Sequence, residues 1–271
     1  MRSFGGLAAA AAALVAGTLS LAASPMSWEW TLPDSIAPPP VPAGNAMTKA
    51  RVALGHRLFY DADLSINGTL SCATCHEQRH SFSDGVQAHP GAHGEPGLRN
   101  VPSLLNVAWA TLLTWADPRL TTLERQAIVP ITGNDPVEMG MESRETELSR
   151  RLSANPCYRK LFAMAFPEAG GRIDFGTVAR ALAAYQRTIV SFDSPWDRAH
   201  AGGGALDEEA RRGQVLFNGA AGAYPVTRVP ISATIACMAS PLQPRTGAQS
   251  VQPGWDRTMA YSARRRFGTW R

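Results

Sequence analysis

Five consecutive residues, Cys72-Ala73-Thr74-Cys75-His76, combine two thiols three positions apart with an imidazole directly after them. Haem c is attached when two such thiols add to its vinyl groups, and the histidine that follows turns its imidazole onto the iron. The sequence therefore predicts one covalent haem c, held by Cys72 and Cys75, with His76 as an iron ligand. A disulfide between the two cysteines is the alternative, but it would not require the histidine.

The haem motif needs elements that position it, and the spacing of apolar residues predicts that these are helices. No stretch alternates apolar and polar residues in the manner of a strand, so the predicted fold class is all-α. A helix is expected to deliver the chain to the motif, and a loop rich in glycine and proline follows it over 81–97. The expected helices cover 46–60, 101–113, 120–128, 146–152, 156–166 and 174–191.

The N-terminus has the composition of an export signal. Residues 1–23 contain a short basic start and an apolar stretch rich in alanine and leucine, which end in small residues. We interpret them as a cleaved signal peptide and expect a periplasmic protein; an uncleaved membrane anchor is the alternative. Residues 24–47 hold six prolines and are expected to form an extended lead-in without helix. Cys157 and Cys237 remain outside the motif, and a disulfide between them is possible.

Further segments accompany the haem motif along the chain. They are Leu54-Gly55, Leu58-Phe59, Arg99-Asn100-Val101-Pro102-Ser103-Leu104-Leu105-Asn106, Pro136-Val137-Glu138-Met139-Gly140 and Asp193-Ser194-Pro195. In combination they resemble the bacterial di-haem cytochrome c peroxidase and MauG family over about residues 49–222. The run Thr114-Trp115-Ala116-Asp117-Pro118-Arg119 departs from the Trp-Asp-Gly-Arg of the peroxidases and leans toward the MauG-like branch, which oxidises side chains of partner proteins.

The resemblance implies two cytochrome modules. Residues 48–204 correspond to the peroxidatic haem c domain, and 205–222 correspond to the start of a second module whose haem relays or stores an electron. The run Arg212-Gly213-Gln214-Val215-Leu216-Phe217 echoes Leu54-Gly55-His56-Arg57-Leu58-Phe59. Two unrelated amphipathic helices would give the same echo.

The resemblance also implies catalytic roles for three side chains. Glu138 moves the proton from one peroxide oxygen to the other, Gln126 orients peroxide, and Trp115 carries electrons between the haems. Each has a structural alternative, namely a solvated loop charge for Glu138, an exposed helix residue for Gln126 and a core side chain for Trp115.

Two further ligands follow from the resemblance. His93 is the expected distal ligand of the haem iron, although His80 and His89 lie in the same loop and an exposed loop histidine is the alternative. Asn100 matches a ligand of a calcium ion between the two family domains, while an asparagine that caps a turn is the other interpretation.

The sequence after Gly222 changes character. Residues 223–271 contain seven arginines, one aspartate and neither lysine nor glutamate, so the positive net charge of the chain, +4, originates there. A basic tail is one sign of nucleic-acid or membrane binding, but we expect neither partner. Back-translated and read one base earlier, 223–238 can give C-I-P-C-H-T-G-P-N-F-S-D, a second haem motif. We therefore interpret the tail as frameshifted and expect it to be disordered as written.

These observations predict a periplasmic c-type haem oxidoreductase. It would reduce hydrogen peroxide with electrons from a small cytochrome c or copper protein, or use peroxide to oxidise a partner protein. The alternatives are a mono-haem electron-transfer cytochrome and a non-functional truncated product.

Overall fold

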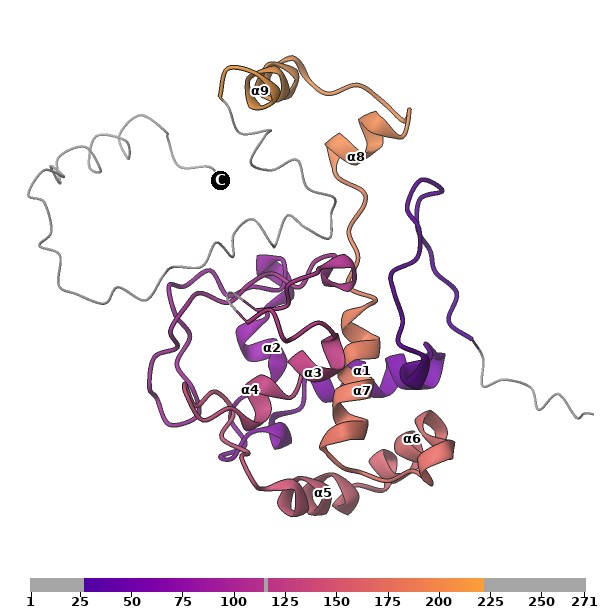
Figure 1. The fold of residues 1–271 in the computed structure, drawn as a ribbon, viewed down its shortest axis with the longest axis vertical. Helices are drawn as coiled ribbons and strands as arrows, with labels where there is room; N and C mark the ends of the chain where they lie inside the picture. The colour runs from indigo at the N-terminus through magenta and orange to yellow at the C-terminus, as the bar shows by residue number, and fades with distance from the viewer. Residues whose placement is uncertain (1–26, 115–116, 222–271) are drawn as a thin grey trace, which may run out of the picture. The chain divides into compact units, whose positions relative to one another are not determined.

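The computed structural model describes residues 27–114 and 117–221, and over these ranges it is built of helices without a named strand, which confirms the all-α prediction (Figure 1). None of the described helices is long and apolar enough to cross a membrane. The α-helices are α1 (Lys49–Phe59), α2 (Cys72–Cys75), α3 (Leu123–Gln126), α4 (Val129–Thr132), α5 (Glu145–Ala154), α6 (Pro156–Ala165), α7 (Phe175–Gln186), α8 (Pro195–His200) and α9 (Glu208–Asn218). Short 3₁₀ turns lie at Ala43–Asn45, Ala62–Leu64, Gln78–His80, Val107–Trp109 and Pro167–Ala169.

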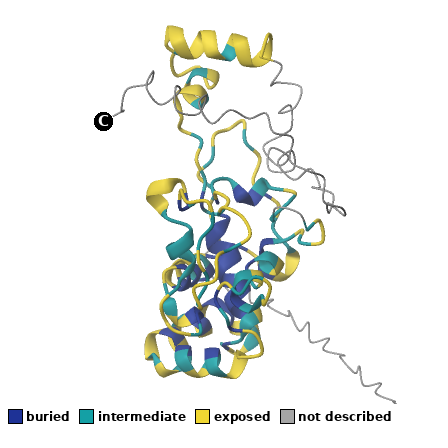
Figure 2. Cartoon of the chain, turned by 90° about the vertical axis from the view of Figure 1, so that its left-hand side faces the viewer, coloured by how far each residue is buried: buried dark blue, intermediate teal, exposed yellow. Residues whose placement is uncertain are grey.

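The core forms where α1 and α7 pack against each other. Asp174 caps the start of α7 by accepting a hydrogen bond from the Thr177 amide, and most residues from Thr177 to Gln186 are buried (Figure 2). Gly55 makes the close approach possible, because a β-carbon at this position would lie 1.9 Å from the Ala181 carbonyl oxygen. The two helices therefore pack backbone against backbone at Gly55, with Leu54 and Leu58 fully buried beside it.

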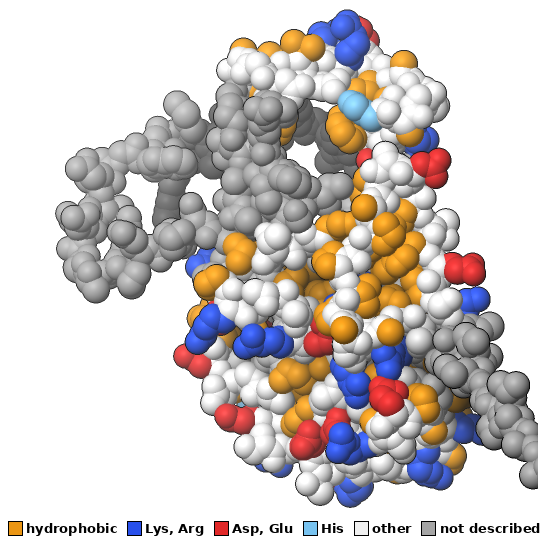
Figure 3. All heavy atoms as spheres, turned by 45° about the vertical axis from the view of Figure 1, so that its right-hand side comes forward, with side chains coloured by type: hydrophobic (Ala, Val, Ile, Leu, Met, Phe, Trp, Pro, Cys, Tyr) orange, Lys and Arg blue, Asp and Glu red, His pale blue; other side chains and the backbone are white. Residues whose placement is uncertain are grey.

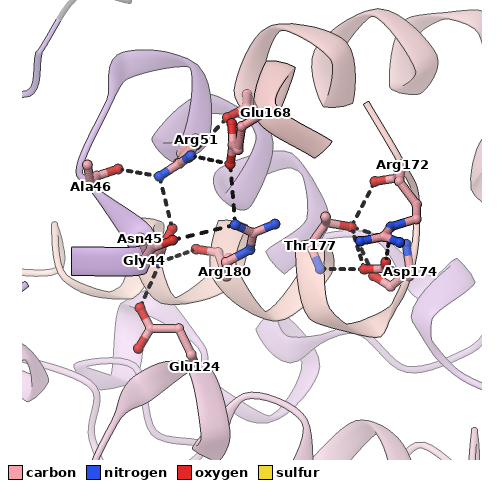
Figure 4. A network of polar contacts seen from close by, with 11 residues as sticks. Gly44, Asn45, Ala46, Arg51, Glu124, Glu168, Arg172, Asp174, Thr177 and Arg180 are labelled. Atoms are coloured by element: carbon pink, nitrogen blue, oxygen red, sulfur yellow. Dashed lines mark hydrogen bonds and ion pairs between the residues drawn. The ribbon is translucent and has the colours of Figure 1, made fainter. Parts of the chain in front are cut away.

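A polar network ties the lead-in to this core (Figure 4). Asn45 donates to the Glu124 carboxylate at 2.7 Å and to the Arg180 carbonyl at 2.9 Å, so it links the chain before α1 to α3 and α7. Arg51 of α1 is buried and donates to the carbonyl oxygens of Ala46 and Ala165 and to Glu168. The lead-in predicted without helix is irregular over its described part, apart from the 3₁₀ turn at Ala43–Asn45.

The helix predicted over 101–113 is wrong, since only the 3₁₀ turn Val107–Trp109 forms there. Asn106 adopts a left-handed conformation with φ 57° and pairs with the chain after α7 instead of with its own helix. Its amide group donates to the Ser191 carbonyl, its side-chain oxygen accepts from the Ser191 amide, and its backbone amide donates to Ile189. Leu104 and Val107 are nevertheless buried, so the apolar residues of this segment pack into the core without forming a helix.

The remaining helix predictions are confirmed with adjusted bounds. The helix expected over 120–128 is a single turn, α3, capped by Thr122, and a second turn with Pro130 near its start, α4. The segments expected over 146–152, 156–166 and 174–191 are α5, α6 and α7, and 81–97 is a loop. The segment 1–23, predicted to be a signal peptide, and the tail 223–271, predicted to be frameshifted, lie outside the described residues.

Candidate haem site

Helix α2 is one turn long and carries both thiols of the haem motif. Ser71 and Thr74 form a capping box that closes its start, with the Ser71 amide donating to the Thr74 hydroxyl at 3.0 Å. Cys72 and Cys75 are half-buried free thiols, so the disulfide alternative is not realised. Burial raises the pKa of each thiol to about 12. The arrangement presents two protonated thiols from one helical turn.

His76 ends α2, and its ring orientation is fixed by the loop that follows. Its Nδ1 lies 2.8 Å from the Phe82 carbonyl oxygen, and because a carbonyl can only accept, Nδ1 is the protonated nitrogen. Burial lowers the pKa of His76, which favours the neutral ring. Nε2 therefore carries the free lone pair, which is the atom that an iron ligand requires.

A tight turn holds the Phe82 carbonyl in place. Ser81 and Phe82 both have a φ of 58°, a left-handed conformation that side chains rarely adopt. The turn is closed by the Phe82 amide donating to the Glu77 carbonyl and the Glu77 amide donating to the Ser83 carbonyl. The Phe82 side chain is buried against Phe59, with ring centroids 6.2 Å apart. Apolar packing thus stabilises a backbone conformation that places the acceptor for His76.

Two carboxylates lie close enough to the motif to act on it. After burial, the charges of Glu138 and then Asp84 raise the pKa of Cys75. Asp84 is buried, accepts from the Val86 amide at 3.1 Å and lies 3.0 Å from Nδ1 of His89. The sequence analysis missed Asp84; its place in the Phe-Ser-Asp run after the motif, in a loop that must fold back on His76, was the available signal.

The backbone around Glu138 is held on three sides. Its carbonyl accepts from the Ala92 amide at 2.7 Å, and Met139 donates to the Pro130 carbonyl and accepts from the Ile66 amide. The Glu138 side chain is exposed to solvent, yet desolvation by surrounding protein raises its pKa. The charge of this carboxylate raises the pKa of Cys75, so the two side chains lie within electrostatic reach of each other.

The three loop histidines differ in their partners. His80 Nδ1 lies 3.4 Å from the Glu77 carboxylate and His89 is paired with Asp84. His93 makes no ion pair within the described part of the chain, and a β-carbon built on Gly140 would lie 3.6 Å from its Nε2. His93 is therefore an exposed side chain that lies close to Gly140, which is two residues along the chain from Glu138.

The other predicted site residues are placed as follows. Gln126 is half-buried at the last position of α3, the helix that packs against α7. Asn100 is exposed in the loop before Val101. Trp115 lies outside the described residues. The structure thus places Cys72, Cys75 and His76 on one helical turn, with the charge of Glu138 acting on Cys75. The roles predicted for these residues and for Gln126, His93 and Asn100 stay predictions.

The chemistry of this donor set fits a covalently attached haem. Two thiols on one helical turn can each form a thioether, and the imidazole at the end of the turn has its Nε2 lone pair free. The carbonyl partner of Nδ1 fixes the tautomer and the ring orientation, as is usual for histidines that bind a metal.

Comparison with known proteins gives a consistent answer. The model of the family described as di-haem cytochrome c peroxidase matches residues 49–205. The chain is 40% identical over 193 residues to the methylamine utilization protein MauG of Methylorubrum extorquens, covering 70% of this chain and 52% of that protein. It is 32% identical over 175 residues to the cytochrome c551 peroxidase of Pseudomonas aeruginosa, covering 64% and 49%.

A solved structure described as a MauG-like protein associated with microbial copper homeostasis superposes with a TM-score of 0.69 at 45% identity, covering 71% of this chain and 55% of that one. The chain spans about half the length of the curated relatives it matches. Since the family model covers more than half of the sequence and includes the whole haem site, the chain belongs to the di-haem cytochrome c peroxidase and MauG family, whose cofactor is haem c.

Proposed function

We propose that this chain is the peroxide-reactive haem module of an exported, periplasmic c-type oxidoreductase. One observation carries the proposal. Two free thiols on a single helical turn lead into His76, whose Nδ1 donates to the Phe82 carbonyl 2.8 Å away, and the charge of Glu138 acts on the second of those thiols. These are the parts that a peroxidatic haem site needs on its two sides.

A haem attached at Cys72 and Cys75 would supply the binding site for hydrogen peroxide and the redox chemistry that cleaves its O–O bond. His76 would hold the haem iron through Nε2. The hydrogen bond from Nδ1 to Phe82 makes the imidazole a stronger electron donor and prevents ring rotation.

Glu138 moves the proton. It accepts the proton of the nearer peroxide oxygen and returns it to the farther one, which leaves as water. A carboxyl does both steps well when its pKa lies nearer the working pH than that of a free glutamate, and desolvation raises the pKa of Glu138 in that direction. Gln126 is assigned the orientation of peroxide, and His93 would be a further ligand of the haem iron.

Reduction of one hydrogen peroxide to two waters takes two electrons and two protons. We assign the electrons to a small cytochrome c or copper protein, or to side chains of a partner protein as the likeness to MauG suggests. Trp115 is proposed as the route toward a second haem, and Asn100 as a ligand of a calcium ion between two modules. Residues 205–222 are proposed to begin that second module.

The proposal is tested on the full chain matured with haem c. Replacement of Glu138 by Gln is expected to lower the rate of the peroxide-induced change in the haem absorption spectrum by about 10²–10⁴-fold, the usual contribution of a general acid–base group. Glu142→Gln is the matched control, because Glu142 is exposed in the same segment and lies four residues further on. An unchanged rate in Glu138→Gln would refute its role.

The same preparation separates the alternatives. A low-spin ferrous haem that ignores peroxide and carbon monoxide indicates a mono-haem electron carrier, and aggregation indicates a non-functional product. We expect one haem per chain, lost when Cys72 and Cys75 are replaced by Ser. Two haems per chain would mean that the tail differs from residues 223–271 as written, as a frameshift near Gly222 predicts; sequencing the gene across that codon decides this.

A further inference from the structure

Aromatic rings lead from His76 through the α1–α7 contact toward the surface. The Phe59 ring lies 6.4 Å from the His76 ring between centroids, 5.1 Å from Tyr185 and 5.3 Å from Tyr60. His56 contacts the same two tyrosines at 5.2 Å and 5.0 Å. Each of these separations is within the range of direct contact between aromatic rings.

Burial falls along this series of rings. Phe59 is completely buried, Tyr185 is 9% exposed and Tyr60 is 46% exposed. Packing in the core holds these rings in place. Tyr185 of α7 can approach α1 closely because Gly55 has no side chain: a β-carbon at Gly55 would lie 2.9 Å from Cβ of Tyr185. A rigid, closely packed series of rings therefore connects the iron-ligand side of the haem site to solvent.

We propose that Tyr60 and Tyr185 form a one-electron oxidation site on the His76 side of the haem, reached through Phe59, at which an external one-electron donor delivers electrons. The proposal rests on the peroxidase function proposed above, since hydrogen peroxide is the oxidant. Phe59 is not itself oxidised and serves as the contact between His76 and the tyrosines.

The chemistry balances at each step. One electron leaves Tyr60 toward the haem site, and its phenolic proton passes to solvent, to which Tyr60 is open. A small redox protein then returns one electron, and solvent returns one proton. Two such cycles pass two electrons to the haem site, and hydrogen peroxide takes up two protons from solvent, so that one hydrogen peroxide becomes two waters.

The state of Tyr185 is consistent with this role. Burial, and then a hydrogen bond with Tyr60, raises the pKa of Tyr185, so that the phenol is neutral at physiological pH. The hydrogen bond couples the two phenols, and Tyr60 connects the buried member of the pair to water.

Ordinary core packing is the competing explanation, and Tyr158 provides the matched control. Tyr158 is also buried and aromatic, but its hydroxyl donates to Asp61, Arg57 lies over its ring and its ring neighbour is Phe162 of the same helix. It has the same chemistry without contact to Phe59 or His76 among its ring contacts in the described chain.

The test uses the haem-loaded full chain, mixed with one equivalent of hydrogen peroxide and frozen rapidly for electron paramagnetic resonance. We expect a tyrosyl radical, and trapping with a nitroso spin trap followed by peptide mass spectrometry should place the adduct on Tyr60. Tyr60→Phe should lose the adduct, and Tyr60→Phe/Tyr185→Phe should lose the radical. Tyr158→Phe should keep both. Haem absorbance and circular dichroism confirm that each variant is folded.

The outcomes separate the two proposals. A peroxide-induced change in the haem spectrum without a tyrosyl radical overturns the oxidation site and leaves the peroxidase function standing. A radical of full intensity in the double variant does the same. No spectral response to peroxide in any variant overturns the peroxidase function, and the oxidation site with it.

Discussion

Helices α1 and α9 contain similar sequences, but the apolar side chains of these sequences lie in opposite environments. Leu58 and Phe59 of α1 are completely buried, whereas the corresponding Leu216 and Phe217 of α9 are 56% and 44% exposed. Figure 3 shows hydrophobic side chains at the surface of the uppermost part of the view, where Figure 1 labels α9. At Gly55 an added β-carbon would collide with α7, but at Gly213 it would meet no atom within 4 Å. The difference shows that the pattern specifies a helix with an apolar face, while burial of that face requires a partner such as α7.

The comparison also distinguishes the formation of a helix from its contribution to the stability of the folded protein. Both helices have side-chain caps, from Thr48 in α1 and Asp207 in α9, so local signals start each of them. Only α1 adds tertiary packing to these signals. Paired substitutions at equivalent features should therefore destabilise the core and leave α9 almost unaffected.

The largest difference in stability effect between the core and α9 is expected for substitutions in ion pairs. Arg187 donates two hydrogen bonds to Glu124 and its side chain is only 3% exposed, so Glu124→Gln should lower the free energy of unfolding by about 3–5 kcal/mol, the usual cost of leaving one partner of a buried pair alone. Arg211 and Glu208 on α9 are well exposed. Glu208→Gln should cause no measurable change in urea denaturation.

The same pair gives a pH dependence. Burial alone would raise the pKa of Glu124, but hydrogen bonds from Arg187 and Asn45 outweigh it and lower the pKa below the unfolded value. The stabilisation is therefore complete above the unfolded pKa, about 4.3, and is lost as the pH falls through the folded pKa. Glu124→Gln should flatten the acid limb of stability against pH. An equally steep limb in that variant would contradict the assignment.

The second contrast concerns apolar burial. Leu58→Ala should cost about 2–5 kcal/mol of unfolding free energy, since it removes a fully buried side chain from the α1–α7 contact. Leu216→Ala should stay within about 0.5 kcal/mol of the wild type, as expected for an exposed side chain. A large loss of stability in Leu216→Ala, measured by thermal denaturation, would reveal a partner for α9.

The smallest difference between the two helices is expected at their glycines, where substitution by alanine should destabilise α1 and stabilise α9. Gly55→Ala must displace the Ala181 carbonyl, so we expect a loss of about 1–3 kcal/mol from overpacking. The added β-carbon of Gly213→Ala meets no neighbouring atom, so this substitution should stabilise helix α9 by about 0.5–1 kcal/mol. Circular dichroism during chemical denaturation measures both. A destabilising Gly213→Ala would indicate that α9 packs closely against another segment.

The sequence determined the chemistry and the class of fold. Haem attachment is a covalent pattern of adjacent residues, so Cys72, Cys75 and His76 could be identified without knowing what surrounds them. Helical periodicity likewise predicted α5, α6 and α7, because each has one apolar face, and α6 and α7 also have side-chain caps. Apolar content alone was insufficient over 101–113, where Asn106 pairs with Ser191 and no helix forms.

Only the tertiary structure decided which atoms meet. The acceptor for His76 is a backbone carbonyl in a left-handed turn, and no residue type in the sequence indicates such an acceptor. Asp84 comes close to His89, and within electrostatic reach of Cys75, only because that turn folds the chain back. The series from His76 through Phe59 to Tyr185 joins residues more than one hundred positions apart across the α1–α7 contact. Periodicity places side chains on a helix face, but contact between faces depends on packing, which is a property of the whole core.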